Sequence, residues 1–486
     1  MNPSAAPAPS ATAARQGRTH SGRPATAGLL AGTLAFVAYL PGLGRSLDFD
    51  SAETVGRFVR PGPPWAVFRE QAVFNNHPLF SFLEQLVRVV TGRSDAAAMR
   101  VLPILCGALA VGVLTWFVAR RHGLAAGLAA GAVLACNPTF VHLSRAVRGY
   151  SLLTLCAIVA TIVVAEDRRA DVVADADADA VKGATRPQWR RWSGPLYVAA
   201  ASVGLATHLY MLPVLAAHVG VLLARGEFDD RWRRRFLWTA GLAGCAYAGM
   251  ADAMLHATAA HGRVFRAGMP WQVATMVTGG GWASLALAPL VGVGAWVVLR
   301  GSRGARGAAV ALAVVLVLLW AGLRSAALED RFFVWLVPGA AYLVGVAVAR
   351  IRAGALLAAG SVVLAAASAV SVAPGYTADP TGYRAAAAVL LAVRAAGETG
   401  CVAGSTGVQP MLAYLDPGVD FTAVTDPAGL DRCDVLVVAT WWPTTADWFA
   451  QDRRVIDAAE ARYSHRLVIG PGDRALVLSD GPLPAF

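Results

Sequence analysis

A series of long stretches without a charged side chain constrains this sequence more than any other feature. A helix that spans a bilayer needs about 20 consecutive apolar residues. Only 15% of the residues are charged and 56% are hydrophobic, which excludes a soluble globule, a disordered chain and a coiled coil. The sequence therefore predicts a mainly α, polytopic membrane helix bundle. The charge-free windows are Pro24–Gly44, Val101–Ala119, Gly123–Ser144, Gly149–Ala165, Trp192–Ala224, Phe236–Ala251, Ala267–Leu299, Gly307–Leu323, Phe332–Ala349 and Ala353–Ala378.

Two of these windows are too long for one simple helix. Trp192–Ala224 has basic residues beyond both of its ends, and two basic ends belong on the same side of a membrane. We therefore expect a hairpin of two short helices that turns at Thr207–Tyr210. In Ala267–Leu299 we expect a single span, with Gly279–Gly281 ending an external lead-in. The sequence then predicts about eleven spans.

Arginine clusters set the expected orientation. The arginine clusters of the short loops fall in alternate loops, on the same side as the N-terminus, and short cytoplasmic loops are the ones enriched in arginine and lysine. We therefore expect a multi-pass plasma membrane protein with a cytoplasmic N-terminus and an extracytoplasmic C-terminus. The same loops account for the net charge of +11, so no nucleic-acid partner is predicted.

Three regions are expected along the chain. They are a disordered cytoplasmic tail (1–23), a transmembrane module (24–374) whose first external loop is 45–100, and an extracytoplasmic α/β domain (375–486). In the last region the sequence predicts a helix at Tyr383–Ala396, a strand within Asp434–Ala439 and a strand–turn–strand at Arg466–Ser479. Cys401 and Cys433 fall in the same region, and either a disulfide or two separate buried thiols is possible there.

Another expectation concerns the cytoplasmic side. The acidic segment Asp171–Ala180 is of low complexity, so we expect a solvated loop there and no metal cluster.

Acidic side chains gather directly after the first span. Asp48, Asp50 and Glu53 lie at the expected outer interface, and on a helix Asp50 and Glu53 would share a face. A carboxylate in such a place can act as a general base or bind a metal, or it can cap a helix in contact with solvent. Further along the loop, His77 precedes a proline. It is either a site residue or a structural histidine.

Two arginines of the expected outer side lie at the mouths of spans. Arg148 lies in a short external turn between two spans, and Arg331 lies at the outer mouth of another. A guanidinium suits phosphate because its planar fork matches two oxygen atoms. The alternative is an arginine whose charged end reaches the interface while its stem stays in lipid.

At these residues the chain resembles the C-type membrane glycosyltransferases, a family that includes protein O-mannosyltransferases, aminoarabinose transferases and many actinobacterial envelope enzymes. The resemblance covers about residues 29–347 and departs from the usual Asp-Glu motif at Ser51, so Asp48 or Glu53 would supply the second carboxylate. It rests on Asp50-Ser-Ala-Glu-Thr-Val55, Asn76-His-Pro-Leu79, Arg120-Arg-His-Gly123, Arg148-Gly-Tyr-Ser-Leu152, Thr207-His-Leu-Tyr210 and Asp330-Arg-Phe-Phe333 followed by Pro338.

The resemblance implies a function and a set of site residues. A sugar would pass from a polyprenyl-phosphate donor to an extracytoplasmic acceptor, with inversion, and a carboxylate of the first loop would be the base. It implies Asp50, Glu53 and Asp48 as catalytic residues. It implies Arg331, Arg148, Tyr150, His77, Asn76 and His208 as substrate-binding residues.

Other assignments stay open at this point. Metal use varies in the family, and Asp48, Asp50, Glu53 and His77 could host a divalent ion, so no cofactor is certain. The alternative functions are a transporter or flippase of lipid-linked sugars and a non-catalytic envelope assembly protein. A transporter would place paired charges inside its spans and show inverted repeats, and we find no convincing repeat.

Overall fold

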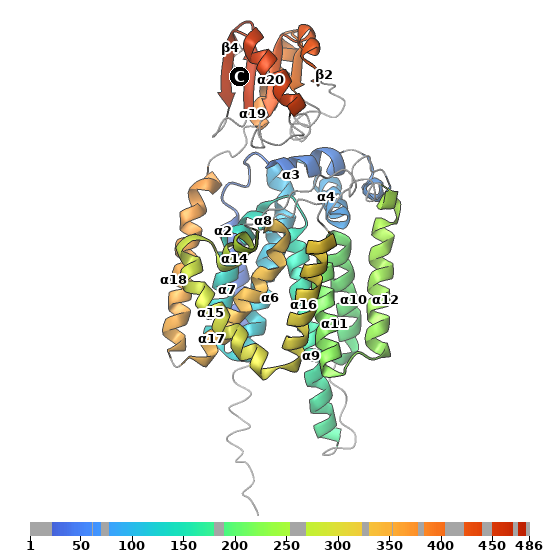
Figure 1. Ribbon diagram of the computed structural model, residues 1–486, viewed down its shortest axis with the longest axis vertical. Helices are drawn as coiled ribbons and strands as arrows, with labels where there is room; N and C mark the ends of the chain where they lie inside the picture. Colours follow the sequence, from blue (N-terminus) through green and yellow to red (C-terminus); the bar gives the residue numbers. More distant parts are fainter. Residues whose placement is uncertain are drawn as a thin grey trace, which may run out of the picture.

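A computed structural model describes residues 22–60, 62–69, 77–178, 189–252, 269–322, 330–351, 353–377, 383–403, 422–439, 450–469 and 475–482. Most of these residues form a bundle of helices, and a small sheet lies beyond one end of the bundle (Figure 1). Both views place the sheet at the end that carries helices α3 (Phe49–Glu53) and α4 (Pro78–Thr91). The tail predicted at 1–23 lies outside the described residues except for its last two.

Close packing fixes the helix that leads into the first loop. Helix α2 (Gly22–Tyr39) packs on α6 (Val101–His122), where a Cβ on Gly28 would lie 2.7 Å from the carbonyl oxygen of Gly112. At the other end of α2, the Tyr39 hydroxyl donates to the carbonyl oxygen of Ala135 at 2.9 Å. These contacts hold the end of α2 from which the first loop departs.

The first loop is a folded cap and not a simple connection. Its buried side chains, such as Val55, Phe80 and Met99, pack on Leu152 of the bundle. Because this apolar layer anchors the loop, its polar residues have fixed positions above the helices. Its elements are α3, η1 (Thr54–Val59), η2 (Pro64–Phe68), α4 and α5 (Ala96–Met99).

The predicted breaks in the two long windows are confirmed. One helix ends at Thr207 and the next begins at Met211, and Gly279 and Gly280 have positive φ values of 95° and 74° between α14 and α15. The remaining helices of the bundle are α7 (Leu124–Ala135), α8 (Pro138–Arg145), α9 (Tyr150–Ala178), α10 (Trp189–Thr207), α11 (Met211–Arg225), α12 (Asp230–Tyr247), η3 (Ala248–Met250), α14 (Met269–Thr278), α15 (Gly281–Gly301), α16 (Arg303–Gly322), η4 (Asp330–Leu336), α17 (Val337–Arg350) and α18 (Gly354–Thr377).

The helices differ from the expectation at two places. The window Gly123–Ser144 is broken, because α7 and α8 meet at an angle of 61°, and the pair is either one broken span or a re-entrant loop. Asn137 causes the break: its side-chain oxygen accepts the Phe140 N–H at 2.9 Å and caps α8, which begins at Pro138. The acidic segment expected as a loop is instead helical as far as Ala178, because α9 continues through it.

The number of spans stays a prediction. Among the described residues, four helices are long and apolar enough to cross a membrane, or five if the bent pair α7–α8 counts as one span. The four are Ala96–His122, Tyr150–Asp167, Ala283–Gly301 and Phe333–Arg350.

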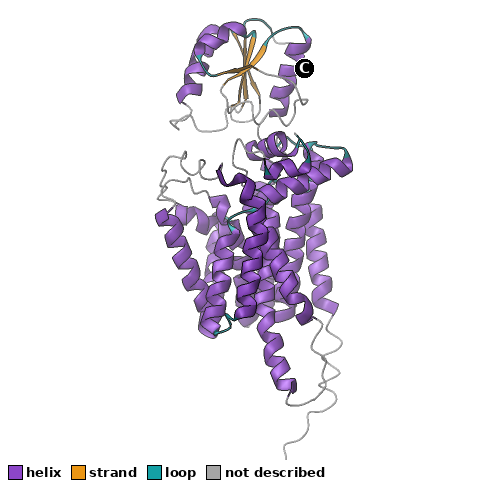
Figure 2. Cartoon of the chain, turned by 90° about the vertical axis from the view of Figure 1, so that its right-hand side faces the viewer, coloured by secondary structure: helices purple, strands orange, loops and turns teal. Residues whose placement is uncertain are grey.

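The C-terminal region forms the predicted α/β unit, a five-stranded sheet in the order β2-β1-β3-β5-β4. Strand β1 is parallel to β2 and β3, whereas β5 is antiparallel to β3 and β4. Alternate side chains of β3 face opposite layers: Val435 and Val437 pack under α19, and Leu436 and Val438 pack under α20. Figure 2 shows helices on both faces of the sheet. The elements are α19 (Tyr383–Ala395), β1 (Gly400–Ala403), β2 (Thr422–Val424), η5 (Pro427–Arg432), β3 (Val435–Ala439), α20 (Ala450–Arg462), β4 (His465–Ile469) and β5 (Ala475–Ser479).

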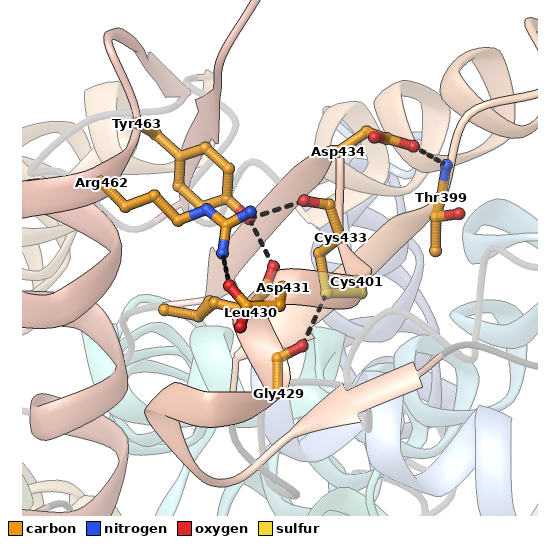
Figure 3. The surroundings of a disulfide bond; sticks show 9 residues. All are labelled: Thr399, Cys401, Gly429, Leu430, Asp431, Cys433, Asp434, Arg462 and Tyr463. Atoms are coloured by element: carbon orange, nitrogen blue, oxygen red, sulfur yellow. Dashed lines mark hydrogen bonds and ion pairs between the residues drawn. A yellow bond between two sulfur atoms is a disulfide. The ribbon is translucent and has the colours of Figure 1, made fainter.

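Cys401 and Cys433 form a disulfide, which is one of the two alternatives that the sequence allowed. Cys401 of β1 is bonded to Cys433, which lies just before β3 (Figure 3). Beside it, the Tyr463 hydroxyl donates to the carbonyl oxygen of Cys433 at 2.9 Å. The bond therefore ties β1 to the segment that leads into its parallel neighbour β3, beneath α20.

We expect iodoacetamide to leave Cys401 and Cys433 unmodified in the native, unreduced protein and to modify both after reduction and denaturation. Replacing both bonded cysteines by alanine should lower the free energy of unfolding of the sheet by about 2–4 kcal/mol, because the unfolded chain gains freedom. Peptide mass spectrometry and thermal unfolding measure the two effects. Alkylation of Cys401 or Cys433 before reduction would contradict the pairing.

Candidate active site

The acidic residues after α2 are arranged by a helix cap. Asp48 accepts the Ser51 N–H at 2.8 Å and the Ser51 hydroxyl at 3.0 Å, so it caps α3 with both carboxylate oxygens. A short helix follows, and it places Asp50 and Glu53 on one face. Asp48 is therefore engaged within its own loop, while Asp50 and Glu53 face the neighbouring segments.

Asp50 meets two arginines that come from distant parts of the chain. Arg148 Nη2 lies 3.0 Å from Asp50 Oδ1, and Arg331 Nη1 donates a hydrogen bond to Asp50 Oδ2. Arg148 Nη2 also lies 3.7 Å from Glu53 Oε2. The side chains of Asp50 and Arg148 are only 13% and 10% exposed, so solvent screens this ion pair weakly. Each oxygen of a single carboxylate thus faces a different guanidinium.

A glycine allows the three outer segments to approach each other. A Cβ on Gly149 would lie 2.3 Å from Cγ2 of Thr207 and 3.0 Å from Nδ1 of His77. The residues next to this glycine, Arg148 and Tyr150, are both predicted site residues. A side chain at position 149 would clash with Thr207 and crowd His77, so only a glycine fits there. The glycine therefore lets the turn before α9 come close to the first loop.

Aromatic rings line the floor of the same site. The ring centroid of His77 lies 5.0 Å from that of Tyr150 and 4.7 Å from that of His208. His208 Nδ1 accepts the Tyr210 N–H at 3.1 Å, so the neutral ring carries its proton on Nε2. The structure thus brings together three predicted residues from three separate segments.

Burial keeps both histidines neutral at physiological pH. Burial, together with the neighbouring His208 and Arg148, holds the pKa of His77 well below its usual value. Burial and Arg148 lower the pKa of His208 to about 3. Neutral imidazoles can donate and accept hydrogen bonds with hydroxyl groups, which suits them to bind a sugar.

The charged groups around them keep their charges. Burial lowers the pKa of Arg331 to about 10 despite the opposing effect of Asp48, and the group is still protonated at neutral pH. Burial alone would raise the pKa of Asp48. His142, the hydrogen bonds from Ser51 and the charge of Arg100 outweigh it and lower that pKa.

Sequence reasoning missed the arginine that holds the two outer loops together. The buried Arg100 guanidinium donates to the carbonyl oxygens of Leu43, Arg45 and Ser46 at 2.6 to 2.8 Å. Its Nε donates to the carbonyl oxygen of Arg145 at 3.2 Å. Arg100 therefore joins the start of the first loop to the turn that carries Arg148. Its position directly before a charge-free window, at the expected outer interface, was the available signal.

Ser51 makes a second link between the same loops. Its hydroxyl oxygen accepts the Val147 N–H at 2.8 Å while donating to Asp48. The residue that departs from the motif therefore ties the first loop to the Arg148 turn, and an ionised glutamate, which has no proton to donate to Asp48, could not make both contacts.

The described residues do not fit a metal. Nowhere among them do three His, Cys, Asp or Glu side chains converge as ligands for an ion. Asp50 and Glu53 instead face guanidinium groups, whose positive charge opposes cation binding. Asn76, a predicted substrate-binding residue, lies outside the described residues.

Replacing Arg100 by alanine should lower the free energy of unfolding by about 3 kcal/mol, because buried carbonyl groups lose their donor. Arg100→Lys should recover only part of it, since one ammonium group cannot reach four carbonyls. Thermal unfolding in detergent measures the change. The exposed Arg93 is the control, and Arg93→Ala should stay within about 0.5 kcal/mol of the wild type. A wild-type transition for Arg100→Ala would refute the role.

Comparison with known proteins identifies the fold. No protein-family model and no curated protein sequence matches this chain. Solved structures do match, among them ArnT from Cupriavidus metallidurans in the apo state and the same protein bound to undecaprenyl phosphate. The first has a TM-score of 0.59 and 16% identity, and the match covers 93% of this chain and 98% of ArnT. The second has a TM-score of 0.59 and 15% identity, over 93% and 99% of the two chains. The predicted glycosyltransferase C-type fold is therefore confirmed.

Proposed function

We propose that this protein is a membrane glycosyltransferase that moves a sugar from a polyprenyl-phosphate donor to an extracytoplasmic acceptor. The observation that carries the proposal is the carboxylate of Asp50 held between Arg148 and Arg331. A base and a pair of phosphate-binding groups thus lie in one site. The ArnT fold supports the donor class, because one of the two ArnT structures contains undecaprenyl phosphate.

In the proposed reaction, the acceptor hydroxyl oxygen attacks the anomeric carbon of the sugar. Its proton passes to Asp50, and the bond from the anomeric carbon to the phosphate oxygen breaks with its electron pair on that oxygen. Arg148 and Arg331 stabilise the charge that develops on the phosphate. Attack opposite the leaving group inverts the anomeric centre. Glu53 keeps Arg148 oriented, and the neutral His77 and His208 face the sugar hydroxyls.

A groove between two spans supports the placement of the apolar chain of the donor. It has a volume of about 540 Å³ and is lined only by residues of α2 and α6, among them Phe36, Leu105 and Leu109. Helix α2 leads directly into the loop that carries Asp50. A prenyl chain in this groove would lie on the same helix that positions the base.

The orientation and the regions of the chain belong to the same proposal. We place the N-terminus in the cytoplasm and the sheet of 375–486 outside, beyond a transmembrane module of about eleven spans. The disulfide between Cys401 and Cys433 supports this side, because disulfides persist in oxidising compartments.

Asp50→Asn should reduce transfer by about 10²–10⁴-fold, because asparagine keeps the shape of the side chain but cannot take a proton. The assay follows the loss of label from the polyprenyl-phosphate sugars of a membrane extract and the gain of glycosidic product. Glu53→Gln should retain much more activity. A dead Glu53→Gln beside an active Asp50→Asn would make Glu53 the base, and full activity of both would refute a base in this loop.

Arg331→Ala should weaken the binding of the lipid donor and reduce transfer, whereas Arg331→Lys should restore only part of each. Lysine keeps the charge but lacks the planar pair of donors that a phosphate accepts. Equilibrium binding of a prenyl phosphate to the purified protein measures the effect. Arg93→Ala removes an exposed arginine of the first loop and should change nothing. If Arg331→Ala binds the donor as tightly as the wild type does, Arg331 does not bind the phosphate.

A further inference from the structure

The groups assigned to the donor phosphate are already paired in this structure. Arg148 faces one oxygen of Asp50 and Arg331 binds the other. A phosphate offers guanidinium groups the same kind of contact, with two or more oxygens that each carry part of a negative charge. A donor phosphate therefore competes with Asp50 for one Nη group of each arginine.

The same pairing affects the base. A positive charge beside a carboxylate favours its ionised form and so makes it a weaker proton acceptor. Asp50 has such a charge at each oxygen. A carboxylate in this state is poorly suited to take a proton from an acceptor hydroxyl, so the catalytic base must first lose at least one arginine.

We propose that Asp50 occupies the anion site of the empty enzyme and that the donor phosphate displaces it from Arg148 and Arg331, which frees the carboxylate to act as the base. This inference rests on the proposed function and adds that donor binding controls when the base becomes active. Donor binding and base activation become one event, because the two anions compete for the same guanidinium groups. Without a donor, the base stays paired.

Each of the two arginines has a second acidic neighbour, which keeps it in the site when phosphate displaces Asp50. Arg148 also lies 3.7 Å from Glu53 Oε2, so it keeps one acidic partner when Asp50 leaves. Arg331 interacts electrostatically with Asp48, which is fixed as the cap of α3. The side chain of Arg331 is 24% exposed, against 10% for Arg148, so it is the more accessible of the two to an incoming phosphate.

Competition also provides for product release. After transfer, the prenyl phosphate has one more free oxygen and more negative charge than the donor, and Asp50 carries the proton of the acceptor. Once Asp50 passes this proton to water, its carboxylate again competes for the arginines. Asp50 then helps to expel the product phosphate.

The test measures binding apart from catalysis. Farnesyl phosphate is titrated into the purified full-length protein in detergent, and farnesol serves as the uncharged probe of the same chain. If Asp50 competes with phosphate, Asp50→Asn binds farnesyl phosphate about tenfold tighter than the wild type, within the usual range of coupling between sites. Farnesol affinity stays the same. Asp95→Asn is the matched control, because Asp95 is an exposed carboxylate of the same loop that, like Asp50, pairs with an arginine.

Two further variants keep the test decisive if Asp50→Asn is unstable. Asp50→Glu retains a competing carboxylate and should bind farnesyl phosphate about as the wild type does. In an Arg331→Ala background, Asp50→Asn should gain clearly less affinity than it does alone, because one of the contested groups is gone. Equal or weaker binding of farnesyl phosphate by Asp50→Asn would overturn the proposal.

Failure of the inference and failure of the proposed function give different results. If Asp50→Asn binds farnesyl phosphate more tightly but the wild type transfers no sugar, the competition stands and the glycosyltransferase activity fails. If the wild type transfers sugar and Asp50→Asn shows no tighter binding, only the competition fails. If neither protein binds farnesyl phosphate better than farnesol, the anion site is wrong and both proposals fall.

Discussion

The outer end of this protein depends on one carboxylate shared by two guanidinium groups. Asp50 belongs to the first loop, Arg148 to the turn before α9 and Arg331 to η4, so their contacts join segments that are far apart in the sequence. Partly buried charges are stable only when they are paired. The pairing therefore stabilises the closed arrangement of the three segments and, in the same place, concentrates the groups needed for chemistry on a phosphate.

The contacts behind this trio are mostly to the backbone. Arg100 binds carbonyl groups of both loops, and Ser51 links Asp48 to the N–H of Val147. Backbone groups cannot change rotamer, so they hold the loops in a defined position. The site thus combines a rigid backbone support with ion pairs that can exchange partners. Because the support fixes where the arginines lie, only an anion in that position can replace Asp50.

Much of the fold follows from local patterns in the sequence. Charge-free windows located the helices, basic residues at both ends of one window indicated the turn at Thr207–Tyr210, and short apolar runs bounded by turn residues indicated three of the C-terminal strands. The bend at Asn137 was not predicted, because Asn137 caps a new helix in the middle of a window that is otherwise apolar. The residue types of the site were also visible. Their pairing and the role of Arg100 were not, because contacts between distant segments have no periodic signal in the chain.

The order of strands in the C-terminal sheet has a consequence for how the protein matures. Strand β5 follows all the others in the sequence, yet it lies between β3 and β4 and pairs with both. The sheet therefore cannot close until Ser479 has been synthesised and, in the proposed orientation, carried across the membrane. The helices can be inserted well before that moment. Biogenesis would then run in two stages, and quality control could sense an incomplete chain as a sheet that lacks an interior strand.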